Sequence, residues 1–275
     1  MSRHLDRLLA STDFAAGVAS DPVRFPKRYQ DPGDVEVAAF VSASLAFGRV
    51  SAFGPVLERI FAVAENYGGP AEFVRRWDAR REQDLVGLYY RWHTNQDLVG
   101  LLRLAGRARE ARGSIGAFFT TGPIESSLGN AITSLRALVP AGVSPHFRTF
   151  LVHPQDGSAC KRWCMLLRWM VRRDTPDLGA WTHLDPADLV IPVDTHVFRV
   201  ARFLGLTQRN APGWVAAMEI TAALAHFSPN DPVRYDFALA HLGISGRCKG
   251  HREPSICPGC SLDSVCLAPA APNRR

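Results

Sequence analysis

The sequence of 275 residues contains no long apolar run and no pattern typical of β-hairpins. No stretch approaches the about 20 consecutive apolar residues that a membrane-spanning helix needs. Residues 1–20 lack the apolar core of a signal peptide. Alternation of apolar and polar residues between turns, which would indicate strands, is also missing. These absences leave a cytoplasmic, all-α protein as the expectation.

Negative charge is scarcer than positive charge. Lys and Arg together number 32 against 26 Asp and Glu, which gives a formal net charge of +6. Otherwise the composition, with 47% hydrophobic and 21% charged residues, is that of an ordinary globular protein. Because a guanidinium binds phosphate through a planar set of donors, this balance is compatible with a nucleic-acid partner but does not require one.

Apolar residues at helical spacing predict a succession of helices. The predicted helical segments cover residues 34–45, 56–67, 71–119 (as several helices), 147–151 and 158–172. Between them, residues 113–146 are rich in Gly, Ser, Thr and Pro, which predicts a long connection with one short helix over 131–138.

Asp194 stands where an apolar, proline-bearing approach meets an amphipathic helix. Pro192 disfavours helix for the residue before it, whereas Val197, Val200 and Ala201 share one helical face. Aspartate is a favourable N-cap at such a position, and most aspartates placed there are caps only. A carboxylate held rigidly at a helix start can also be catalytic, so both roles stay open at this point.

The six cysteines are distributed unevenly. Four of them form the pattern C-x8-C-x2-C-x5-C, at Cys248, Cys257, Cys260 and Cys266. Four thiolates at this spacing can surround one zinc ion or one iron–sulfur cluster, and a cytoplasmic chain favours ligation over disulfides. A zinc ribbon usually has two CxxC pairs. The single pair here favours a [4Fe-4S] cluster, with zinc as the alternative.

The other two cysteines, Cys160 and Cys164, lie four residues apart in a predicted helix. Buried thiols that only pack are the expectation for them.

The cysteine pattern and the segment 193–200 together resemble the helix-hairpin-helix DNA glycosylases typified by endonuclease III. Members with a cluster end in a C-x6-C-x2-C-x5-C loop, so this chain has two extra residues in the first interval. The family signature V-D-T-H-[IV]-x-R-V is matched at residues 193–200. The resemblance implies that Asp194 is catalytic, that His196 orients the Asp194 loop, and that His196 and Arg199 contact DNA.

A third family element is a hairpin of the form G-x-G-x-K that opens a helix. The best match is Gly157-Ser158-Ala159-Cys160-Lys161, with Ala159 in place of the second glycine. Such a turn directs backbone N–H groups at a phosphate. In bifunctional members the lysine attacks the sugar as an amine nucleophile, which makes Lys161 a candidate catalytic residue.

Two alternatives stay open for this hairpin. In one, Lys161 only binds phosphate beside Arg162. In the other, a different register pairs Pro154 and Gly157 with the family's P-G-x-G and leaves no lysine at the nucleophile position.

The predicted helix from residue 34 resembles the family's first barrel helix, which supplies a side chain to fill the gap left by an extruded base. Ser44 occupies the position of the family's glutamine and is too short to fill that gap alone, so Phe47 or Arg49 are alternatives. The segment 89–93, Tyr-Tyr-Arg-Trp-His, could stack on a flipped base. Core aromatics with a snorkelling arginine are the commoner explanation of such a segment.

The resemblance implies two helical lobes around a DNA-binding cleft. Residues 34–190 would form a helical barrel with the hairpin, and residues 1–33 and 191–275 the cluster-bearing lobe. Separately from the resemblance, the Ala- and Pro-rich end of the chain, residues 268–275, is expected to be a disordered tail. The implied function is excision of a damaged or modified base from double-stranded DNA by a monomeric enzyme, with or without AP lyase activity through Lys161. A non-catalytic DNA- or RNA-binding protein of the same fold is the alternative.

Overall fold

The computed structural model describes residues 1–271, and these are all-helical, with no β-strand among them. The all-α prediction is therefore confirmed. The α-helices of this part are α1 (Ser2–Ala10), α2 (Phe14–Ala19), α3 (Pro32–Leu45), α4 (Val50–Glu65), α5 (Pro70–Arg75), α6 (Ala79–Asp84), α7 (Asn95–Arg112), α8 (Ile124–Arg136), α9 (Lys161–Val171), α10 (Thr195–Phe203), α11 (Trp214–Ala225) and α12 (Asp236–Ile244).

Short 3-10 helices connect them: η1 (Pro22–Arg24), η2 (Pro26–Arg28), η3 (Gly116–Phe118), η4 (Pro145–Leu151), η5 (Pro154–Asp156), η6 (Pro186–Asp188), η7 (Cys257–Gly259) and η8 (Asp263–Val265). None of the helices in residues 1–271 combines the length and the apolar composition that a membrane span requires.

Helix α3 is the centre of the N-terminal two thirds of the chain. Asp31 caps its start by accepting hydrogen bonds from the amides of Gly33 and Asp34, and Pro32 occupies the first position. Every residue from Val35 to Leu45 is buried, as expected for a helix that is apolar on all sides. It packs against α9, α5, α4 and α7.

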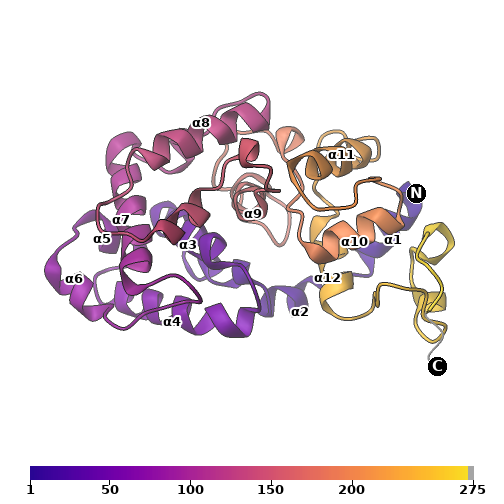
Figure 1. Ribbon diagram of the computed structural model, residues 1–275, viewed down its shortest axis with the longest axis horizontal. Coiled ribbons are helices and arrows are strands. Elements are labelled where there is room, and N and C mark those ends of the chain that lie inside the picture. The colour runs from indigo at the N-terminus through magenta and orange to yellow at the C-terminus, as the bar shows by residue number, and fades with distance from the viewer. Residues whose placement is uncertain (272–275) are drawn as a thin grey trace.

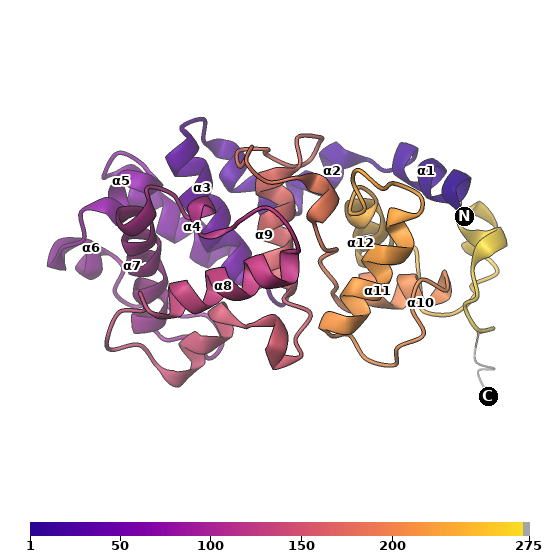
Figure 2. The same ribbon diagram turned by 90° about the horizontal axis from the view of Figure 1, so that it is seen from above.

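Helices α10, α11, α12 and α1 lie together on the far side of α9 from α4–α7 (Figures 1 and 2). Within this group α10 and α1 both contact α12, and Phe14 of α2 stacks on Phe237 of α12. The C-terminal loop is attached to α10, because the amide of Leu267 donates to the carbonyl of Phe203 over 2.7 Å. The segment η1–η2, which follows α2, packs on α3 instead.

The stretch predicted as a long connection with one short helix contains a longer helix. α8 begins at Ile124, and the prediction of a helix over only 131–138 is wrong. Its buried face is formed by Leu128, Ala131, Ile132 and Leu135, at the spacing of a helix. Serines and a glycine in its first half hide this pattern, and packing supplies what their low helix propensity lacks.

Residues 147–151 form part of the 3-10 helix η4. Near the C-terminus, the amide of Arg252 donates to the carbonyl of Pro269 over 2.7 Å, so residues 268–271 of the predicted tail lie against the loop. The remainder of that tail, residues 272–275, lies outside the described residues.

Candidate functional site

The chain reverses direction immediately before α9. Gly157 has φ +78° and Cys160 has φ +47°, so two residues in the left-handed region flank Ser158 and Ala159. The amide of Cys160 donates to Ser158 Oγ over 3.3 Å, and its thiol donates to the carbonyl of Val152. Because a non-glycine residue rarely adopts such a φ, this turn is held by its surroundings, and it places Lys161 at the first position of α9.

Arg162 fixes the start of α9 against the end of α3. Its guanidinium donates to the carbonyl of Ser44 over 2.7 Å and to the carbonyl of Thr149. Burial lowers the pKa of Arg162 to about 10. Ser44 itself is only 6% exposed. In the structure, Arg162 therefore donates to carbonyls inside the protein, and the side chain of Ser44 is buried. The resemblance implied that both residues contact DNA.

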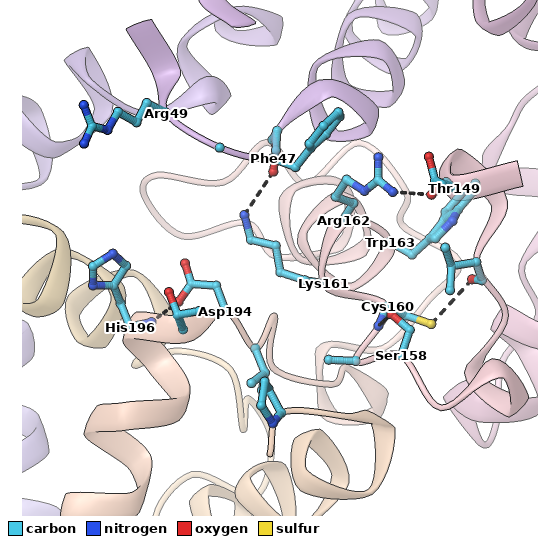
Figure 3. Close-up of a pocket in the computed structure, with 17 residues that line it drawn as sticks. Phe47, Arg49, Thr149, Ser158, Cys160, Lys161, Arg162, Trp163, Asp194 and His196 are labelled. Atoms are coloured by element: carbon cyan, nitrogen blue, oxygen red, sulfur yellow. Dashed lines mark hydrogen bonds between the residues drawn. The ribbon is translucent and has the colours of Figure 1, made fainter. Parts of the chain in front are cut away.

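Lys161 extends from α9 toward the segment that follows α3. Its Nζ lies 3.4 Å from the carbonyl oxygen of Ala46, and the side chain is half-buried. Figure 3 shows Lys161 and Asp194 in one pocket, Lys161 from α9 and Asp194 from the segment before α10.

Asp194 is the N-cap of α10, as its sequence position predicts. Its Oδ1 accepts from the amide of His196 over 2.9 Å and from the amide of Val197 over 2.8 Å. Oδ2 makes no hydrogen bond within residues 1–271, so this oxygen is free to interact with a ligand. One carboxylate thus serves both as a cap and as a charged group in the pocket.

The pocket has a volume of about 630 Å³ and is formed by four parts of the chain: residues 46–49, residues between 149 and 163, residues 193–196, and Pro212. It contains many of the predicted site residues: Arg49, Ser158, Ala159, Lys161, Arg162, Asp194 and His196. Phe47, the alternative gap-filling residue, lines it as well, whereas Gly157 is exposed just outside. Sequence reasoning missed Thr149, Val152, Trp163, Thr195 and Pro212, which also line the pocket.

Arg199 lies away from this pocket, toward the C-terminal loop. It donates to the carbonyl of Cys248 over 3.1 Å, and the same nitrogen is 3.5 Å from Nδ1 of His196. A side chain implied to contact DNA therefore connects the pocket wall to the first cysteine of the loop.

The four C-terminal cysteines line one small cavity between this loop and helices α10 and α12. None of the four forms a disulfide, and the amide of Glu253 donates to Cys257 Sγ over 3.2 Å. Among residues 1–271, no three His, Cys, Asp or Glu side chains are arranged closely enough to hold a metal ion. Four thiols that share one cavity, with an amide directed at one sulfur, are nevertheless a donor set that suits a cluster or zinc.

Cys160 and Cys164 are 3% and 1% exposed. Burial raises the pKa of Cys160 to about 12 and raises that of Cys164 well above its usual value. Both therefore remain neutral thiols at physiological pH, in agreement with a packing role.

In structural terms, the described residues form an all-helical protein. Its central pocket combines Lys161, at the start of α9, with Asp194, immediately before α10. By sequence, the chain belongs to the family described as "Protein of unknown function (DUF2400)", whose model matches residues 21–245. The match includes every residue of the pocket and ends before Cys248. No curated protein and no solved structure matches the chain.

Proposed function

We propose that this protein is a DNA glycosylase that extrudes a damaged or modified base from double-stranded DNA and excises it. The observation that carries the proposal is the pocket in which Lys161 and Asp194 lie together. A base must leave the helical stack before its glycosidic bond can be reached, and a pocket of about 630 Å³ has room for a nucleoside.

Asp194 would act through its charge. Its free Oδ2 would stabilise the positive charge that develops on the sugar as the bond to the base breaks. Hydrogen bonds from two α10 amides hold Oδ1, so the carboxylate is oriented before the substrate arrives. Water, or the amine of Lys161, would then bond to the anomeric carbon, and the base, which leaves with the electron pair of the broken bond, would take up the proton that the nucleophile releases.

Lys161 would confer AP lyase activity if its amine is the nucleophile. The bond between C1′ and the ring oxygen of the sugar would then break to give an imine between enzyme and sugar, from which the 3′-phosphate can leave by elimination. To reach the sugar, Nζ must exchange its contact with the carbonyl of Ala46. The exposed Arg49 and the turn around Gly157 and Ser158 border the pocket and would contact the phosphates on either side of the extruded nucleotide.

Asp194→Asn tests the role of the carboxylate. Asparagine caps a helix as well as aspartate does, so we expect α10 to stay intact, DNA binding to persist, and base release to fall about 100-fold or more. Asp185→Asn is the matched control, since Asp185 caps η6 through the amide of Ala187 and lies outside the pocket. A screen of duplexes with defined lesions supplies the substrate. Unchanged turnover by Asp194→Asn would refute the proposal.

Borohydride trapping tests the role of Lys161. A covalent adduct that forms with lesion-bearing duplex and disappears in Lys161→Gln would support a lyase. Base release without an adduct would support water as the nucleophile and leave Lys161 as a phosphate ligand.

A non-catalytic DNA- or RNA-binding protein is the second candidate. The observation that favours it is the internal use of Arg162 and the burial of Ser44, which leave less of the implied DNA surface than the resemblance predicts. Binding of nucleic acid without base release from any lesion in the screen would favour this candidate.

We also propose that Cys248, Cys257, Cys260 and Cys266 hold a [4Fe-4S] cluster, with zinc as the alternative. A bound cluster would crosslink the C-terminal loop at four points beside α10, and we assign it no part in base release. Iron and sulfide analysis with visible absorbance on anaerobically purified protein distinguishes the two, and a colourless, zinc-loaded protein would refute the cluster. We expect the active protein to be a monomer that is associated with the bacterial nucleoid.

A further inference from the structure

Two exposed aromatic side chains lie in one short turn. Among the Phe, Tyr and Trp residues of the described chain, only Tyr89 and Trp92 are exposed, at 74% and 45%. Their neighbours Tyr90 and His93 are 4% and 1% exposed. The segment 89–93, which we call the aromatic turn, therefore combines two core side chains with two that face solvent. Core packing alone does not explain it.

The aromatic turn is rigidly built. Tyr90 and His93 exchange two backbone hydrogen bonds, over 3.0 and 2.9 Å, and so enclose Arg91 and Trp92 at the tip. The hydroxyl of Tyr90 donates to the carbonyl of Phe47. Arg91 has φ +55°, and strain of this kind in a residue other than glycine is concentrated at functional sites.

The turn adjoins the pocket. Trp92 stacks on Phe47, which lines the pocket, with ring centroids 5.3 Å apart and an interplanar angle of 28°. Gly48, also in the pocket wall, lies so close that a Cβ there would come within 2.6 Å of an Arg91 Nη atom and 2.9 Å of the Tyr90 hydroxyl. The aromatic surface of Trp92 is thus continuous with the pocket wall.

The charges around this surface favour an anionic ligand. The guanidinium carbon of Arg91 lies 5.8 Å from the centre of the Trp92 ring. Arg49 is exposed at the pocket, and no Asp or Glu occurs in the aromatic turn. Planar rings flanked by arginines are the surface on which proteins stack nucleobases and hold their phosphates.

We propose that the aromatic turn binds an unpaired nucleobase beside the pocket, with the base stacked on Trp92 and its phosphate near Arg91. The base is distinct from the one that enters the pocket. This inference rests on the proposed function only in that nucleic acid occupies the pocket, and it does not require catalysis.

Binding of two duplexes by the full-length protein tests it. In one, a tetrahydrofuran abasic analogue lies opposite a normal base, which is left unpaired. In the other, two abasic analogues face each other, so no unpaired base exists. We expect wild type to prefer the first duplex. Trp92→Ala should weaken binding to it by about 5- to 150-fold, and Trp92→Phe should restore most of the affinity.

The second duplex separates stacking from a structural effect. We expect Trp92→Ala to bind it as wild type does, and Ile244→Ala, which shortens an exposed apolar side chain of α12, to change neither affinity. An equal loss on both duplexes, no loss on either, or no binding by wild type would overturn the inference. Because both duplexes lack a scissile base, a preference for the unpaired base would stand even if no lesion were ever excised.

Discussion

We expect Asp236→Asn to raise the free energy of unfolding at neutral pH, although it removes a buried charge that contacts an arginine. Asp236 belongs to a network in which two buried arginines bind three aspartates that are buried or half-buried. Arg168 donates to Asp177 over 3.1 Å and to Asp236, and Arg172 donates to Asp177 and, over 2.8 and 3.0 Å, to Asp231. Oδ1 of Asp236 has no hydrogen-bond partner among residues 1–271. The network thus holds one more negative than positive charge.

Burial raises the pKa of Asp236 to about 6 from an ordinary value of 3.8, although the positive charge of Arg168 opposes the shift. At about 1.4 kcal/mol per pKa unit, ionised Asp236 destabilises the folded state by about 3 kcal/mol above pH 6. Asparagine keeps one oxygen as an acceptor for Arg168 and removes the charge. We therefore expect a gain of about 2 kcal/mol.

The pH dependence of the unfolding free energy tests the direction of this pKa shift. Since the folded-state pKa lies above the unfolded value, the folded protein takes up a proton at Asp236 as pH falls through about 6. Wild type then recovers the lost stability, and its difference from Asp236→Asn should shrink toward pH 4. Urea unfolding of both proteins at pH values on either side of 6 measures this, and other titrating groups cancel in the difference.

Asp177→Asn is the control. Both oxygens of Asp177 accept from arginines, so an amide N–H there would face a guanidinium, and we expect a loss of about 3 to 5 kcal/mol. The reasoning would be refuted if Asp236→Asn destabilised the protein at neutral pH, or if its difference from wild type were the same at about pH 7.5 and about pH 5.

Three further predictions concern a buried carboxylate, the turn before α9 and a buried histidine. Glu36→Gln should cost about 3 kcal/mol in urea unfolding, because the buried carboxylate accepts from Arg109, Ser114, Gly116 and Trp181. Glu58→Gln, at an exposed pair, should cost at most about 1 kcal/mol. Cys160→Gly should unfold at higher urea than Cys160→Ala, since only glycine relieves φ +47°; the opposite order would contradict strain there. Burial lowers the pKa of His93 to about 4, so the stability that this neutral histidine contributes is lost as pH falls from about 6.5 toward 4. The difference in unfolding free energy should therefore shift in favour of His93→Phe over that range, while the opposite contribution of Asp236 is common to both proteins and cancels; an unchanged difference would count against the pKa shift.

The sequence predicted the helices well where their apolar pattern is local. The run from residue 34 to 45 needs only its own spacing, and the structure has α3 at Pro32–Leu45. α8 was shortened in prediction because Gly129 and its neighbouring serines weaken the local preference. The helix is stabilised by the packing of Leu128 and Leu135 against the rest of the protein. Contacts with distant parts of the chain cannot be inferred from the sequence of this segment alone.

The residues of the candidate site likewise fall into those that a local motif predicts and those that only the fold brings into the pocket. Asp194 and Lys161 were found from short motifs, and the structure brings them into one pocket. Thr149 and Val152 carry no motif and enter the wall only through the fold. The orientation of Arg162 was also beyond prediction, because its partners are backbone carbonyls of Ser44 and Thr149, and a carbonyl offers the same acceptor whatever the residue.

The buried ion pair of Asp236 and Arg168, which we expect to lower stability, also connects, through α12, the helices at whose starts the two pocket residues lie. α9 begins at Lys161, and α10 follows Asp194. Asp236 lies on α12, which packs on α10, and it binds Arg168 of α9. A directional charge pair therefore joins α9, which begins at Lys161, to the helix that packs on α10, and we expect this pair to help set the spacing of the two pocket residues. We expect Asp236→Asn to be more stable than wild type for the reason given above. For the proposed glycosylase activity, we expect the same variant to release the base more slowly, with DNA binding unchanged. A gain in stability with unchanged base release would show that the network leaves the pocket geometry unaffected.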